Sequence, residues 1–133
     1  MILGIYKEII ICIVVIVLVI TLNIWTENYT KESIVKMSDR LETLKQAMNE
    51  EERNKENIES QINNILDDWN NRYQKLAYYI EHDELEKVKT ELVSLKANID
   101  VEEYEQGIPD LDKCVFILDH IKEKSALQIK NIF

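Results

Sequence analysis

The stretch that decides the fold is IIICIVVIVLVITLNIW, residues 9–25. None of its 17 side chains is charged. About 17 residues is near the lower limit for a helix that crosses a bilayer. Residues 2–6 are also mainly apolar and lengthen the stretch if Lys7 and Glu8 pair or extend to the interface. The pattern therefore predicts an N-terminal transmembrane helix.

The residues after this apolar stretch indicate whether signal peptidase removes the segment. Residues 21–26, TLNIWT, contain no pair of small residues of the kind that signal peptidase needs. Residues 1–26 are therefore predicted to stay as a transmembrane signal anchor. We expect a single-pass protein of the cell membrane, with its N-terminus inside and residues 27–133 on the extracytoplasmic side.

The charge of the chain lies entirely outside this segment. The 133 residues have a formal net charge of −9, and in residues 1–26 the only charged side chains are Lys7 and Glu8. Residues 27–133 therefore form a strongly acidic domain, which excludes a nucleic-acid partner because phosphate binding needs a basic face. The two glycines and one proline leave few helix breakers, which predicts an all-α domain.

Apolar residues in the domain recur at helical spacing. One seam with spacing 3, 4, 3, 4 consists of Ile34, Met37, Leu41, Leu44 and Met48. A homodimer through this Ile34–Met48 seam is one predicted contact. A polar run at 49–57 follows, then apolar helical faces at 58–80, 85–99 and 111–132. Gly107 and Pro109 predict a helix end followed by the first turn of the next helix.

These segments are similar in length and their connections are short. The predicted fold is therefore an antiparallel up-down-up-down helical bundle after the transmembrane helix. The heptad phase of Met48 also continues through residues 51, 55 and 58. The alternative is therefore one long stalk helix against which only the last two helices fold back.

Catalytic and metal-binding patterns are missing from the sequence. Neither His82 nor His120 has a glutamate three positions earlier, as a di-metal bundle would require. The isolated glycines cannot form a phosphate loop. We therefore predict no enzyme activity, no catalytic residue, no metal and no cofactor. Cys114 is expected to pack as a small apolar residue and to form no disulfide with Cys12.

Several residues are candidates for structural or interaction roles. Trp69 and Tyr73 are expected in the core, with the tyrosine hydroxyl reaching solvent. Asp83 with Glu86 predicts a capping box at the start of a helix. The bundle topology places the turn around His82 and the C-terminus at the membrane-proximal end. We therefore predict that Ile132 or Phe133 packs near Ile80–Leu85, with His82 capping or pairing there.

Two short patterns suggest a family. The run LAYYIEHDEL at 76–85, preceded by Trp69 and Arg72-Tyr73, and the ending KNIF at 130–133 resemble the bacterial family catalogued as domain of unknown function 4363. That resemblance implies a short protein with an N-terminal membrane segment and an acidic helical body. It implies no assigned activity and no catalytic residues.

The functional expectation follows from these points. We expect a non-enzymatic, membrane-anchored helical module that acts through protein–protein contacts. The alternative is an extracytoplasmic ligand-sensing domain that works through a partner protein. An apolar cavity with polar groups near Trp69 and Tyr73 would favour sensing, whereas a tightly filled core would favour a scaffold.

Overall fold

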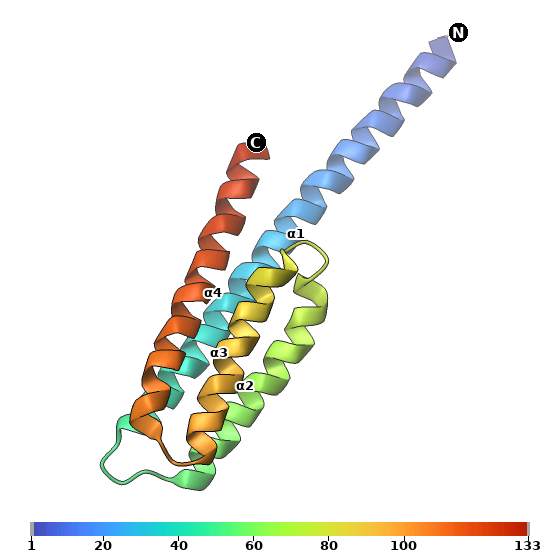
Figure 1. Cartoon of the computed structure of the whole chain (residues 1–133). Coiled ribbons are helices and arrows are strands. Elements are labelled where there is room, and N and C mark those ends of the chain that lie inside the picture. Colours follow the sequence, from blue (N-terminus) through green and yellow to red (C-terminus); the bar gives the residue numbers. More distant parts are fainter. Residues whose placement is uncertain (1, 133) are drawn as a thin grey trace.

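The chain folds as four helices, and the computed structural model describes the backbone of residues 2–132 and the side-chain surroundings of residues 2–127. The helices are α1 (Ile2–Asn49), α2 (Lys55–Leu76), α3 (His82–Asp100) and α4 (Tyr104–Ile132). Each helix packs on the next, and α4 also packs on α1. Figure 1 shows the resulting antiparallel bundle, with α1 extending far beyond the other three helices. The predicted all-α bundle is confirmed.

Helix α1 contains both the apolar segment and the first helix of the bundle. It runs for 48 residues without interruption, about 72 Å at 1.5 Å per residue. An 18-residue window within it has the length and apolar composition to cross a membrane, and none of that window is buried. A signal sequence has the same properties. The first buried residue of α1 is Thr30, so burial begins shortly after the apolar segment ends.

The predicted seam of α1 lies in the core. Its five side chains are at most 1% exposed and pack with apolar residues of the other helices. The core from α2 to α4 includes Ile58, Ile62, Ile65, Trp69, Leu76, Leu85, Val88, Leu92, Leu95, Ile99, Leu111, Cys114, Leu118 and Ile121. A homodimer through the Ile34–Met48 seam stays a prediction, and it would require these side chains to leave the core.

The polar run after Met48 is a turn. Residues 50–54 separate α1 from α2, and the side chain of Asn54 caps α2 by accepting a hydrogen bond from the Asn57 amide at 3.1 Å. Arg53 donates to the carbonyl of Met48 at 2.7 Å and so satisfies one of the last carbonyls of α1. The alternative of one long stalk helix through residues 49–57 is therefore wrong.

The prediction for Gly107 and Pro109 was wrong by more than one helical turn. Helix α3 ends at Asp100, and the reversal uses Glu102 at φ 60°. Gly107 and Pro109 lie inside α4. A Cβ atom at residue 107 would lie 3.1 Å from Met48 Cε and 3.2 Å from Leu95 Cδ1. Glycine is used here for the close approach of α4 to two neighbouring helices, and not for the turn.

Candidate functional site between α1 and α2

A polar groove with a volume of about 630 Å³ lies between α1 and α2. Its lining residues are Asp39, Arg40, Thr43, Gln61, Asn64, Ile65, Asp68 and Asn71. Most of these residues are one or two places from a core position in the sequence of α1 or α2. Their side chains therefore lie along the edge of the buried face of each helix. Three side-chain amides, two carboxylates, one guanidinium and one hydroxyl therefore face one groove.

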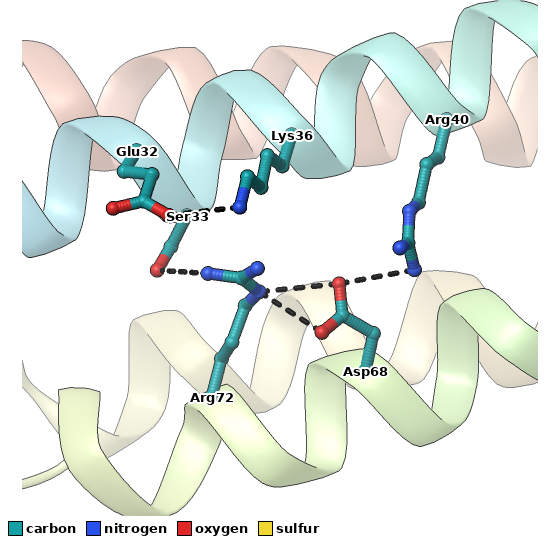
Figure 2. A network of polar contacts seen from close by, with 6 residues as sticks. All are labelled: Glu32, Ser33, Lys36, Arg40, Asp68 and Arg72. Carbon is teal, nitrogen blue, oxygen red and sulfur yellow. Dashed lines mark hydrogen bonds and ion pairs between the residues drawn. The ribbon is translucent and has the colours of Figure 1, made fainter.

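A network of polar contacts joins the two helices at this groove (Figure 2). Asp68 pairs with Arg72 on its own helix at 3.1 Å and with Arg40 of α1 at 3.2 Å. Arg72 also donates to the hydroxyl oxygen of Ser33 at 2.9 Å. Ser33 is fully buried and the Arg72 side chain is 13% exposed. The network thus satisfies a buried hydroxyl and ties α2 to α1 with charge-assisted hydrogen bonds.

A separate ion pair lies on the exposed face of α1 beside this network. Lys36 lies 2.9 Å from Glu32, one helical turn away. Lys36 lowers the pKa of Glu32, first through their hydrogen bond and then through its charge. Both side chains are more than half exposed, so this pair adds little to the stability of the bundle.

The chemistry of the groove is that of a binding surface. Amides and hydroxyls can donate and accept hydrogen bonds, and the carboxylates and the guanidinium add charges of both signs. The groove therefore suits a polar or zwitterionic group, such as a polar side chain of another protein. Within residues 2–132 no cluster of three or more His, Cys, Asp and Glu side chains is arranged to hold a metal ion.

The residues predicted from the sequence occupy a different part of the bundle. Trp69 is fully buried, and its Nε1 atom has no hydrogen-bond partner. Tyr73 is half-buried; its hydroxyl donates to Glu86 at 2.8 Å and lies 2.7 Å from Nδ1 of His82. Desolvation, followed by the hydrogen bond to Glu86, raises the pKa of Tyr73. The ring of His82 thus joins the ends of α2 and α3.

The remaining predicted residues surround the turn between α2 and α3. Ile80 packs against the core and Leu85 is fully buried. The capping-box prediction for Asp83 was wrong, because α3 begins earlier, after Glu81, and no side chain caps it. Phe133 and the side chain of Ile132 lie outside the described residues, so their predicted packing near Ile80–Leu85 stays a prediction.

Sequence reasoning missed the groove because, apart from the core residue Ile65, none of its residues belongs to an apolar face or a known motif. One signal was present: Asp68 and Arg72 are four residues apart, the spacing of an ion pair on one face of a helix. Nothing in the sequence pairs Arg40 or Ser33 with that face, because the pairing depends on the register between α1 and α2.

Comparisons with known proteins identify a family and no activity. The family model described as Domain of unknown function (DUF4363) matches residues 24–132, and the chain belongs to this family. No curated protein matches the chain. No solved structure matches it either.

Proposed function

We propose that this member of the DUF4363 family is a non-enzymatic, single-pass membrane protein whose helical body acts through contacts with another protein. The observation that carries the proposal is helix α1. In its N-terminal half, residues 9–22 expose an apolar surface without a charged side chain, and its C-terminal half supplies one side of the bundle core.

The apolar half of α1 needs a non-aqueous environment. Between residues 9 and 20 its large side chains are 37–63% exposed, and no other helix covers them. Apolar area left in water costs about 25 cal/mol per Å², so a surface of this extent favours transfer into lipid. A helix also satisfies its own backbone hydrogen bonds, as a membrane span must.

A membrane extraction experiment tests the anchor. Replacing Val14 and Val17 with lysine should move the full-length chain from the carbonate-resistant pellet to the soluble fraction, because charge in the middle of a span is costly. The matched control is Val93→Lys on α3, which changes an exposed valine of the bundle. A native chain that carbonate extracts from membranes would contradict the proposal.

The orientation is part of the same proposal, with the N-terminus inside and the bundle outside. A C-terminal alkaline phosphatase fusion to the full-length chain should then be active, and a C-terminal fluorescent reporter that folds only in the cytoplasm should be dark. The opposite pair of results would reverse the orientation and leave the anchor in place.

Protein contact is favoured over catalysis by the filled core and the nature of the groove. The core residues leave Trp69 no exposed surface, and the polar groups of the groove lie on the outside between α1 and α2. A photo-crosslinking amino acid at Asn64 in the groove should capture a protein in membranes. The same amino acid at Asp119, an exposed position of α4, is the matched control. Equal capture at both positions, or none at Asn64, would contradict a partner at the groove.

Ligand sensing is the second candidate, and the volume of the groove favours it. About 630 Å³ lies within the range of roughly 300–1,000 Å³ that is typical of small-molecule sites, although such sites are mostly apolar. Native mass spectrometry of the full-length protein tests this candidate. A bound small molecule that is lost in Asn64→Trp would support sensing, and an identical unliganded mass for both proteins would count against it.

A further inference from the structure

Hydrogen bonds hold the turn between α2 and α3 at a fixed position along the axis of α1. The Thr30 hydroxyl donates to the hydroxyl oxygen of Tyr79 at 2.9 Å, and Tyr79 donates to the Thr26 carbonyl at 3.3 Å. Thr26 directly follows Trp25, the last residue of the apolar segment. Because α1 rises 1.5 Å per residue, the end of the Tyr79 side chain lies within about 8 Å of Trp25 along the helix axis. The turn therefore lies at the level where the apolar segment ends.

Aromatic side chains gather at this level from two separate elements. On α1 the rings of Trp25 and Tyr29 are stacked, with their centroids 5.8 Å apart. On the turn Tyr79 points at α1, whereas its neighbour Tyr78 is 89% exposed. Tryptophan and tyrosine are the residues enriched where a membrane meets water. The exposed ring of Tyr78 is thus placed where an interfacial aromatic side chain is expected.

Helix α4 extends beyond this level in the same direction. A cavity of about 220 Å³ is lined by Thr30 and Lys31 of α1 and by Ser125 and Ala126 of α4, so these residues lie at the same height. The helix continues to Ile132, which is about 9 Å further at 1.5 Å per residue. Figure 1 shows α4 extending past the α2–α3 turn in the same general direction as the apolar half of α1, with the two helices diverging there. The end of α4 therefore reaches the level where the apolar segment ends, and Leu127 near this end is exposed.

Charge is distributed unequally between the two ends of the bundle. The two turns at the far end, residues 50–54 and 101–103, contain five glutamates and one arginine. The turn at residues 77–81 contains one acidic residue, Glu81, which lies 3.7 Å from the Lys124 ammonium group. An anionic lipid surface would therefore repel the two far turns more strongly than it repels the turn at residues 77–81.

From these heights, exposures and charges, we infer that the near end of the bundle rests in the headgroup layer of the bilayer that the apolar segment enters. Tyr78 and Leu127 make this contact. The inference rests on the proposed membrane anchoring of α1. The bilayer is the partner of this surface, because contacts with α1 hold the surface at the level where the apolar segment ends.

The contact has a mechanical consequence. A bundle attached to the membrane through α1 alone is free to tilt about the point where α1 leaves the bilayer. Tyr78 on the α2–α3 turn and Leu127 on α4 belong to other parts of the same bundle, so three points of support fix the tilt. The groove between α1 and α2 then faces sideways, along the membrane plane, for any protein that binds there.

Depth measurement with nitroxide spin labels tests the inference on the full-length chain in phospholipid nanodiscs. Single cysteines replace Tyr78, Leu127, Val17 and, as the matched control at the far end, Val101, in a Cys12→Ala background. Val101 is 63% exposed. The native Cys114 is fully buried and remains unlabelled, which mass spectrometry of the labelled protein verifies.

The expected result is a several-fold loss of collisions with a water-soluble nickel chelate at positions 78 and 127 relative to position 101. Position 17 should be shielded from nickel and open to oxygen. Water-like collisions at both 78 and 127, with position 17 shielded, would overturn the contact and leave the anchor intact. Water-like collisions at position 17 would overturn the anchor proposal, and this inference with it.

Discussion

Removal of the Arg72 guanidinium tests whether the polar network holds α2 against α1. Arg72→Met keeps the length of the side chain but leaves the fully buried hydroxyl of Ser33 without its 2.9 Å partner. A buried polar group left without a partner costs about 1–3 kcal/mol. Loss of the partly buried pair with Asp68 adds about 1 kcal/mol, since Arg40 still neutralises that carboxylate. The variant should therefore lose roughly 2–4 kcal/mol of unfolding free energy.

The same reasoning predicts non-additivity. Ser33→Ala alone should cost about 1 kcal/mol, because it removes one hydrogen bond but strands no buried group. Ser33→Ala combined with Arg72→Met should cost less than the sum of the two single changes by about 1 kcal/mol or more, because the hydroxyl is then absent. The measurement is urea unfolding of the full-length chain in a non-ionic detergent, followed by circular dichroism.

The matched control is Lys36→Met, which makes the same kind of change on the exposed face of α1. Lys36 pairs with Glu32, and both side chains are more than half exposed, so the midpoint should hardly move. The reasoning would be refuted if Arg72→Met proved as mild as Lys36→Met. It would also fail if the effects of Ser33→Ala and Arg72→Met were strictly additive.

Three further predictions concern other parts of the bundle. Burial raises the pKa of Cys114 from its ordinary value of 9.0 to about 12, so the thiol should resist iodoacetamide at pH 8 and react after urea unfolding; rapid alkylation of the folded chain would contradict this. Above pH 9 the folded chain keeps the Cys114 proton, whereas the unfolded chain releases it. The free energy of unfolding should therefore fall as the pH rises above 9, and it should fall less in Cys114→Ala. Gly107→Leu should cost about 1–3 kcal/mol or more, because a Cβ atom there already meets two core side chains at 3.1 and 3.2 Å. Gly4→Leu, which meets nothing within 4 Å, is the control, and equal unfolding midpoints would refute the packing argument. Asp110→Ala should cost about 1–3 kcal/mol, because Asp110 accepts hydrogen bonds from two side chains of α3 at 2.8 and 2.9 Å. Asp112→Ala removes only a largely exposed ion pair with Lys45 at 2.9 Å, so it should cost less in the same urea titration, and a larger loss at Asp112 than at Asp110 would contradict the assignment.

The helices and their buried faces could be predicted because they depend on local periodicity. The seam from Ile34 to Met48 and the core positions of α3 follow directly from spacing, and Cys114 is buried as expected. The turn at 49–57 was predicted as one of two possibilities. The heptad phase alone could not distinguish a turn from a continuous helix, since both structures keep the same Ile34–Met48 seam. Asn54 as a side-chain cap of α2 decides for the turn.

The errors arose where one residue type has two physical uses. Glycine serves both left-handed turns and close helix packing, and Gly107 has the second use. The reversal before α4 is made by Glu102, a residue without a turn signal. Asp83 resembled a helix cap, but α3 begins one residue before it, and the preceding tyrosines and Glu81 form the turn. The groove could not be predicted at all, because it depends on which flanks of α1 and α2 meet.

The unbroken course of α1 connects the two parts of the proposed function. The helix has no proline and no glycine after Gly4, so it has no flexible joint between the apolar segment and the core. One wall of the groove, with Asp39, Arg40 and Thr43, belongs to this same helix. A partner that binds in the groove therefore contacts the helix for which membrane anchoring is proposed. Binding in the groove and the proposed tilt of α1 in a bilayer influence each other only where both change the same arrangement of α1 and α2, and that influence is then reciprocal.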